Sequence, residues 1–281
     1  MNGKGKGKGG GGFPVRVGTT SGWRTVAKLA VRPSASNGGV AVGLFRSGSH
    51  EVVPIPNCRA HHPSVNAAAE AVREACDDLG ITAYDEGAGE GMLRYVAANV
   101  ERRTGRVQLT LVWNSSPPVG GGEKAEAETM LDSLAKRLIL EGGGDDDDED
   151  DDNEDDDPSS FALHSLWVHY NASWKHSNAI FDIGDGDGTG GGEVGEGDVK
   201  AESPPPNWRL LHGPPHVIET LDLSKSNVPQ PNPVRLRFPP NVFRQANLDA
   251  FADVVSRTCP LVMNLARGND NKNQGKGHPF H

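Results

Sequence analysis

Three cysteines have the clearest chemical potential in this chain, because a thiolate can act as a nucleophile or as a metal ligand. They are Cys58, Cys76 and Cys259. Their odd number and wide spacing indicate no disulfide framework, so we expect a reducing compartment. The pattern Cys58-x-x-His61-His62 could contribute to a zinc site. A fourth ligand at the usual spacing is missing, which argues against zinc.

Polar amide side chains mark a second stretch with potential for binding. Residues 242–247 contain Gln245 and Asn247 and follow a proline-rich segment, residues 238–241. Apolar residues then recur at spacings of three and four, which predicts an amphipathic helix; they are Leu248, Phe251, Ala252, Val254, Val255 and Cys259. Asn241 or Asn247 could cap this helix, so a capped surface helix is the simplest interpretation of the stretch alone.

Two acidic stretches could hold cations. Residues 185–190, together with Glu196, partly match a calcium-binding loop, but Thr189 replaces a preferred Asp or Asn and no amphipathic helices flank the loop. The run at residues 145–157 contains twelve acids and one Asn, and could bind cations loosely or mimic nucleic acid. A solvated loop is the default interpretation of both stretches.

The composition of the 281 residues limits how much of the chain can pack. A Gly/Lys repeat at residues 1–12 and biased insertions at residues 142–159 and 184–206 bury too little apolar surface to offset the entropy of ordering them. Roughly 200 residues remain, a normal size for one domain. Removing the twelve acids changes the net charge from −10 to +2, so the foldable part is mildly basic, which is compatible with RNA.

The chain contains no run of eighteen apolar residues, so we expect no membrane span. Residues 1–12 have no apolar centre and do not form a signal peptide or a convincing transit peptide. We therefore expect an intracellular location, with the chloroplast or another organelle as an alternative. The glycosylation patterns at Asn114 and Asn171 are discounted, because nothing else indicates secretion.

The pattern of elements predicts an α+β fold rich in antiparallel strands, with a few helices and two insertions. Pro63 and Gly80 bound the clearest helix, residues 63–79, and a second helix is expected at residues 123–140. Alternating apolar residues predict strands. The expected strands are residues 23–32, 40–45, 51–55, 92–103, 106–113, 161–170, 178–183, 208–212, 217–221 and 234–238.

Two blocks together resemble the RNA (uracil-5-)-methyltransferase family. The first is Phe243-x-Gln245-x-Asn247 after a strand and opening a helix. The second is the block at residues 43–63, which contains Gly43-Leu-Phe-Arg, Gly48-Ser-His, Cys58 and His62-Pro and is followed by the hairpin at residues 92–109. Residues 166–178 resemble the version found in plant and algal members.

The resemblance implies roles for four residues. The family's Gln, which matches Gln245, contacts S-adenosylmethionine. We expect Phe243 to be buried and to anchor the turn, and Asn247 to cap the helix, so that both support the cofactor site. Cys58 matches one cysteine ligand of a four-iron, four-sulfur cluster found in some members. The other three would lie upstream, where this chain has no cysteine, so a cluster is not expected here.

The resemblance also implies the chemistry. In the family a cysteine thiolate adds to C6 of a flipped-out uracil, C5 takes the methyl group, and a carboxylate removes the C5 proton. That cysteine belongs to a late Ser-Cys-Asn-Pro-like motif, and neither this motif nor the glycine-rich cofactor turn occurs in this sequence. Cys259 lies too early to match it. We therefore expect a fragment that is inactive alone.

The implied domain division is a low-complexity tail at residues 1–12, a central RNA-binding-like domain at residues 13–240, a linker helix at residues 241–268 and a polar tail at residues 269–281. The implied function is S-adenosylmethionine-dependent methylation of ribosomal or transfer RNA at uracil C5. A non-catalytic RNA-binding module and an unrelated α+β interaction domain are the alternatives. The RNA class, the modified uridine and the oligomeric state are left open.

Basic and aromatic residues that could meet RNA form a last group, because single strands are held by phosphate contacts and stacking. They are Arg94, Arg102, Arg103, Arg106, Trp23 and Trp113. Core packing is the favoured interpretation of the two tryptophans.

Overall fold

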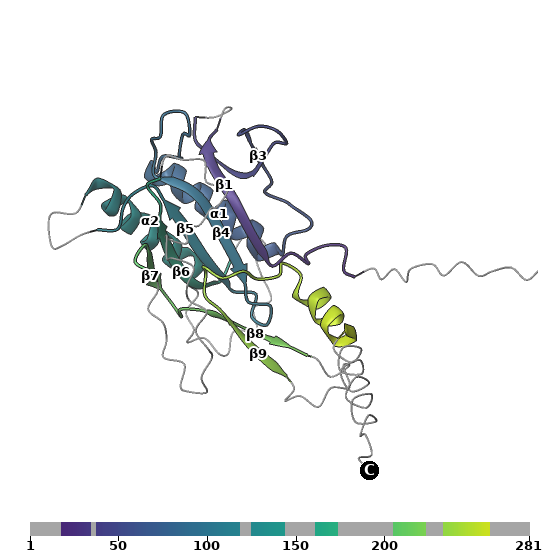
Figure 1. The fold of residues 1–281 in the computed structure, drawn as a ribbon. Coiled ribbons are helices and arrows are strands. Elements are labelled where there is room, and N and C mark those ends of the chain that lie inside the picture. The colour runs from purple at the N-terminus through teal and green to yellow at the C-terminus, as the bar shows by residue number, and fades with distance from the viewer. Residues whose placement is uncertain are drawn as a thin grey trace, which may run out of the picture.

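Seven strands form the main sheet (Figure 1), and the computed structural model describes residues 18–34, 38–118, 125–143, 161–173, 205–222 and 233–258. The strands lie in the order β3-β2-β1-β4-β5-β6-β7. Their bounds are β1 (Val26–Pro33), β2 (Val40–Phe45), β3 (Val52–Pro54), β4 (Leu93–Val100), β5 (Val107–Trp113), β6 (Leu163–Tyr170) and β7 (Trp208–His212). A separate antiparallel ribbon pairs β8 (Val217–Leu221) with β9 (Val234–Phe238). The α+β expectation is confirmed.

One pair in the main sheet, β5 with β6, is parallel, and the other pairs are antiparallel. Helix α2 (Glu126–Gly142) connects these two strands. A helical crossover is the usual way to bring a chain back in the same direction. The sequence pattern did not single out this parallel pair, because each strand's alternation is the same whichever way its neighbour runs.

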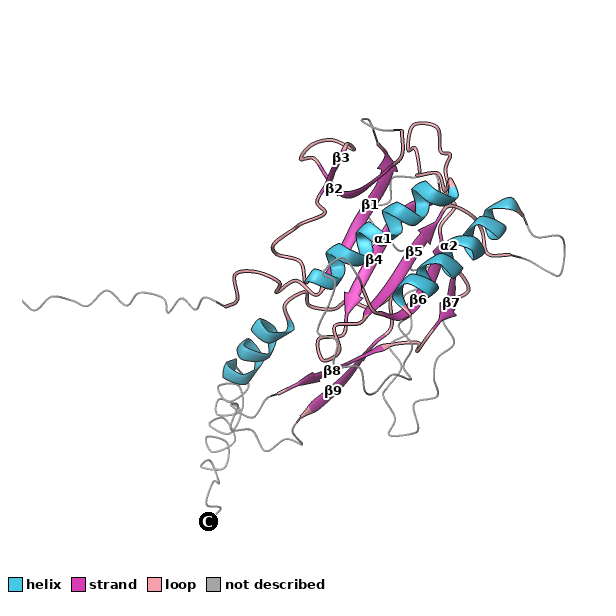
Figure 2. Cartoon of the chain, turned by 180° about the vertical axis from the view of Figure 1, so that it is seen from behind, coloured by secondary structure: helices cyan, strands magenta, loops and turns pink. Residues whose placement is uncertain are grey.

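Both helices cover one face of the sheet (Figure 2), where α1 (Pro63–Leu79) lies beside α2. On β1 the residues Ala27, Leu29 and Val31 point into this layer and are buried, as the alternation predicts. Leu109 and Leu111 on β5 and Leu131, Leu134 and Leu138 on α2 belong to the same core. A smaller cluster on the other face contains Ala97, Val112, Trp167 and Trp208.

Helix α1 has the predicted bounds. Pro63 occupies the first turn, where its missing N–H costs nothing. Gly80 ends the helix with φ +67°, a conformation that side chains disfavour. The Nδ1 atom of His62 accepts a hydrogen bond from the backbone N–H of Ser64 at 3.3 Å, so a histidine rather than a hydroxyl or amide caps the start.

Gly43, the first residue of the second family-like block, has a structural reason to be glycine. A Cβ atom there would lie 2.0 Å from the carbonyl oxygen of Val53, on the neighbouring strand β3. Any side chain would therefore separate β2 from β3.

Several sequence expectations lie outside the described residues. These are the strand at residues 178–183, the acidic run at residues 145–157, the calcium-like loop at residues 185–190, Cys259 and the tails at both ends. Within the part of the chain that the structure describes, none of the helices is long and apolar enough to cross a membrane.

Candidate functional site

Residues 241–249 pass one end of the main sheet and lead into a helix that begins at residue 248 and is described to residue 258 (Figure 1). The carbonyl oxygen of Ala246 accepts hydrogen bonds from the N–H of Thr25 at 2.9 Å and from its hydroxyl at 3.1 Å. Arg244 donates to the carbonyl oxygen of Val100 at 2.8 Å. Thr25 precedes β1 and Val100 ends β4, so the segment is fastened to the sheet at two adjacent strands.

Arg244, not Phe243, is the buried anchor of this segment. Its side chain is 2% exposed and forms an ion pair with Glu219 of β8. The guanidinium also lies 5.3 Å from the ring centre of Phe238. Burial lowers the pKa of Arg244, and the charge of Glu219 opposes that shift. The sequence analysis identified neither Arg244 nor Glu219. The usable signal was the position of Arg244, a charged residue between Phe243 and Gln245.

The expectation that Phe243 is buried is wrong, because its side chain is 81% exposed. Arg244 is buried, whereas both of its neighbours, Phe243 and Gln245, are exposed. Gln245 does not pack within the domain. The expected cap is confirmed, since Asn247 Oδ1 accepts a hydrogen bond from the N–H of Ala250 at 2.9 Å.

Arg102 joins the hairpin between β4 and β5 to the same cluster. Its backbone N–H and its Nε donate to Glu219 at 3.0 and 2.8 Å. Its guanidinium also pairs with Asp249 and donates to the carbonyl oxygen of Thr220 at 3.0 Å. A cavity of about 290 Å³ lies beside this cluster; it is lined by Arg102, Thr220, Leu221, Asp222, Asp249, Ala252, Asp253 and Ser256.

The helix after the segment leaves much of its apolar side uncovered. Leu248 is buried, but Val254 is 56% exposed and Phe251 is exposed as well. Val242 and Phe243 add two more exposed apolar side chains just before the helix. The amphipathic pattern therefore predicts the helix correctly, whereas its apolar side does not join the main core.

The Cys58–His62 loop is held at the same end of the sheet. The N–H of Arg24 donates to the carbonyl of Ala60, and the N–H of His62 donates to the carbonyl of Arg24. His61 Nδ1 lies 3.2 Å from Asn66 Oδ1, while His62 caps α1, so both rings have local structural partners. Burial lowers the pKa of both histidines.

No group of three or more His, Cys, Asp or Glu side chains able to hold a metal ion occurs among the described residues. Cys58 is half-buried. Cys76 is fully buried on α1, and burial raises the pKa of its thiol to about 12. Cys76 is therefore a small core residue, and a thiol with this pKa carries almost no thiolate at neutral pH.

The residues expected to meet RNA divide into two groups. Arg94 is buried and donates to the carbonyl oxygens of Asn171 at 2.8 Å and Ser173 at 2.7 Å, and Trp113 is fully buried. The expectation of RNA contact is wrong for Arg94, because its side chain completes the domain interior, whereas the favoured interpretation of Trp113 as a core residue is confirmed. The side chain of Arg103 is 81% exposed, whereas Arg102 forms ion pairs with Glu219 and Asp249. Trp23 and Arg106 are half-buried.

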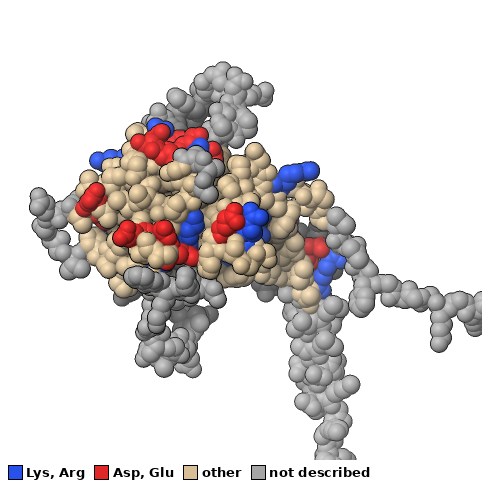
Figure 3. Space-filling model, turned by 90° about the horizontal axis from the view of Figure 1, so that it is seen from above, with Lys and Arg blue, Asp and Glu red and all other residues tan. Residues whose placement is uncertain are grey.

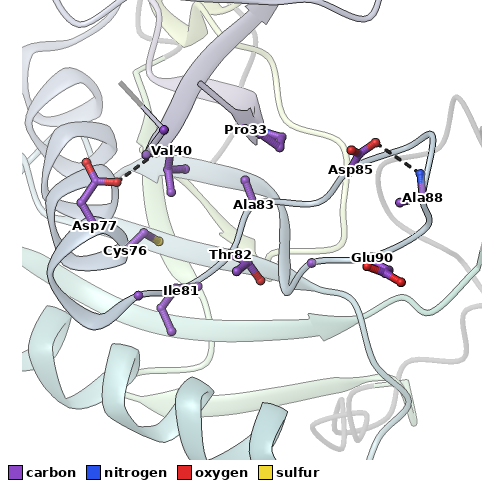
Figure 4. A pocket seen from close by; sticks show the side chains of 14 residues that line it. Pro33, Val40, Cys76, Asp77, Ile81, Thr82, Ala83, Asp85, Ala88 and Glu90 are labelled. Atoms are coloured by element: carbon purple, nitrogen blue, oxygen red, sulfur yellow. Dashed lines mark hydrogen bonds between the residues drawn. The ribbon is translucent and has the colours of Figure 1, made fainter. Parts of the chain in front are cut away.

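A cavity of about 550 Å³ lies at the opposite end of the sheet, near Pro33 and the end of α1 (Figure 4). Its carboxylates already serve backbone groups: Asp77 accepts from the N–H of Val40 at 2.9 Å, and Asp85 accepts from the N–H of Ala88 at 3.3 Å. Among the described residues that line this cavity there is no lysine, arginine or histidine. It therefore offers no counter-charge for an RNA phosphate and is remote from Gln245.

No family model matches the chain. An uncharacterized RNA methyltransferase of Protochlamydia amoebophila is 28% identical over 254 residues, which cover 89% of this chain and 50% of the relative. The chain is thus similar in sequence to a protein described as an RNA methyltransferase. A second such protein, from Caldanaerobacter subterraneus, is 38% identical over 72 residues, covering 26% of this chain and 16% of the relative. This relationship agrees with the family expected from the sequence at the level of RNA methyltransferases.

Among solved structures, the chain resembles the tRNA (uracil-54, C5)-methyltransferase of Pyrococcus abyssi in complex with S-adenosyl-L-homocysteine. The identity is 17% and the TM-score 0.47, and the match covers 84% of this chain and 40% of that one. The chain spans about half the length of the Protochlamydia amoebophila protein that it matches.

Proposed function

We propose that this chain is the RNA-binding part of an S-adenosylmethionine-dependent methyltransferase that modifies uracil C5 in ribosomal or transfer RNA. One observation carries the proposal. In a relative of RNA methyltransferases, Gln245 is exposed on a segment that the buried Arg244 fixes to the sheet. A neutral amide held outward in this way can donate and accept hydrogen bonds at a cofactor without first being released from the protein.

The neighbours of Gln245 suit the same task. Phe243 presents an exposed ring two residues away, and an aromatic ring can stack on an unpaired base. Asn247 is occupied as the helix cap, so its part in cofactor binding is to fix the start of the helix. In this proposal residues 13–240 form the central domain and residues 241–268 the linker to a methyltransferase domain.

The reaction needs a thiolate, a carboxylate base and bound S-adenosylmethionine. The described cysteines do not suit the first role: Cys76 is buried as a thiol, and Cys58 lies in the loop before α1. The chain's own contribution is therefore to hold RNA and to present Gln245 and Phe243. Cys58, which matches an iron–sulfur ligand position in the family, is proposed only as a remnant of that position.

The experiment follows the proton that methylation at C5 must displace. The longest product of the gene that encodes these residues is incubated with S-adenosylmethionine and RNA carrying tritium at uridine C5. We expect cofactor-dependent release of tritium into water together with methyl transfer. Methyl transfer without tritium release would place the modification at another atom. Neither signal, with RNA binding retained, would favour the non-catalytic RNA-binding module.

A further inference from the structure

The exposed arginines of this protein differ in whether a carboxylate neutralises them. Arg46 pairs with Glu51, and Arg257 pairs with Asp253. Arg137 lies near Asp78 and Glu141. Among the described residues, four exposed arginines make no ion pair; they are Arg24, Arg59, Arg235 and Arg237, the unpaired arginine set. Their full positive charge is available to a partner.

All four lie at the end of the molecule that carries Gln245. The N–H of Gly22 donates to the carbonyl of Arg59, and the next residue after Arg24, Thr25, bonds to Ala246. Arg235 and Arg237 are on β9, whose partner strand β8 supplies Glu219 to Arg102 and Arg244. The set therefore surrounds the segment that presents Gln245.

The β8–β9 ribbon has two different faces. Its inner face holds the buried Val217, Glu219 and Leu221. Its outer face carries the two arginines, which pair across the ribbon with uncharged residues: Arg235 with Thr220 and Arg237 with Ile218. Residues two apart on a strand lie about 7 Å apart along it. The outer face is thus a short row of positive charge that contains no carboxylate among these paired residues.

The other end of the molecule has the opposite character. Glu51, Asp85 and Glu90 are exposed there, close to the cavities near Pro33. Figure 3 looks onto the end that is uppermost in Figure 1, where acidic side chains gather in patches with Lys and Arg side chains beside them. The exposed carboxylates there disfavour the binding of a polyanion near these cavities.

We propose that the outer face of the β8–β9 ribbon, together with Arg24 and Arg59, binds the phosphate backbone of single-stranded RNA and leads it to the Gln245 segment. The proposal rests on the proposed function for the identity of the polyanion. RNA is favoured over a protein partner because the outer face offers charge and no large exposed apolar side chain.

The test measures binding of the full 281-residue chain to a fluorescently labelled, uridine-rich single-stranded RNA over a series of salt concentrations. Each phosphate contact to a single strand contributes about 0.7 to the slope of log K against log salt. Arg235→Ala/Arg237→Ala should lower that slope by about 1.4 and weaken binding about 25-fold at 0.1 M salt. Arg235→Lys/Arg237→Lys should keep most of the slope, because it keeps both charges.

The matched control is Arg46→Ala/Arg137→Ala, which removes two exposed arginines that are paired with carboxylates outside the proposed surface. It should leave the slope unchanged. An equal loss in both alanine pairs would reveal an effect of net charge alone and overturn the proposal. An unchanged slope in Arg235→Ala/Arg237→Ala would also overturn it and point to a protein contact at the ribbon, without touching the tritium-release test. Failure of the wild-type chain to bind RNA would overturn it too.

Discussion

A single inward side chain decides how the candidate site is presented. Arg244 is held by Glu219, by the carbonyl of Val100 and by the ring of Phe238. The two residues that flank it, Phe243 and Gln245, are both exposed. A buried ion pair is weak evidence for added stability, since desolvation offsets much of the attraction. Its role here is to specify one orientation of the segment.

That role predicts unequal costs for removing the two partners. Glu219→Gln should lower the free energy of unfolding by about 3–5 kcal/mol, because it leaves the buried Arg244 without its carboxylate and leaves Arg102 with Asp249 alone. Arg244→Met should cost less, since Glu219 keeps Arg102. The double variant should lose less free energy of unfolding than the two single variants lose together. Urea unfolding of the four proteins measures this coupling, and strictly additive losses would show that the pair does not act as a unit.

Gln245 can be tested separately from the fold. Its side chain is exposed, so Gln245→Ala should leave stability almost unchanged. In the methyltransferase that we propose this chain to be part of, losing one neutral hydrogen bond should weaken S-adenosylmethionine binding by roughly 0.5–1.5 kcal/mol, at most about tenfold. Calorimetric titration with the cofactor measures the change, with Asn241→Ala as an exposed neighbouring control. Unchanged affinity and turnover would reduce Gln245 to a structural residue.

At the scale of elements, the loop before α1 joins the start of β1 to the helix. It contains His61, which is buried, and His62, which is half-buried. Burial lowers the pKa of His61, with its bond to Asn66 acting in the opposite direction, and burial also lowers the pKa of His62. The folded protein therefore binds these protons less readily than the unfolded chain. The stability is complete above the unfolded pKa of about 6.5 and falls as pH drops below it.

We expect the protein to lose stability between pH 7.5 and pH 5.5, in a range where most carboxylates remain charged. His61→Gln should be less sensitive to this change, because glutamine does not titrate. Urea midpoints at both pH values provide the measurement. The variant can differ in stability from the wild type at pH 7.5, so the comparison uses the change in urea midpoint between the two pH values within each protein. Equal differences in both proteins would exclude His61 as the source.

At the scale of the whole molecule, the acidic run is inserted between two elements that already touch. A Cβ atom on Gly142, the last residue of α2, would lie 2.8 Å from Leu163 and 2.9 Å from Phe161, so the ends of the connection are close together. Replacing residues 145–158 with a short Gly/Ser linker should shift the melting temperature by no more than a few degrees, because loop length changes closure entropy only slowly. Loss of the cooperative transition would show that the run is structural.

The expectations that the structure confirmed are those that depend on local sequence patterns. Local patterns determined α1 from Pro63 to Leu79, the strand at β1 and the cap at Asn247, because each depends on periodicity or on one nearby hydrogen bond. Composition was also enough to separate the biased insertions from the foldable residues. These features need no knowledge of what lies across the fold.

Only the tertiary structure decided which polar and aromatic residues are accessible. Arg94 is buried, although it was expected to meet RNA, and Phe243 is exposed, although it was expected to be buried. Contacts between residues distant in sequence set these outcomes. Arg94 donates a hydrogen bond to the carbonyl oxygen of Asn171, just after β6, and Arg244 is buried in an ion pair with Glu219 while its neighbour Phe243 is exposed. Whether Phe243 is exposed depends on where its neighbour Arg244 finds a carboxylate. The cluster around Glu219 requires elements more than a hundred residues apart to meet, as Arg102 meets Glu219.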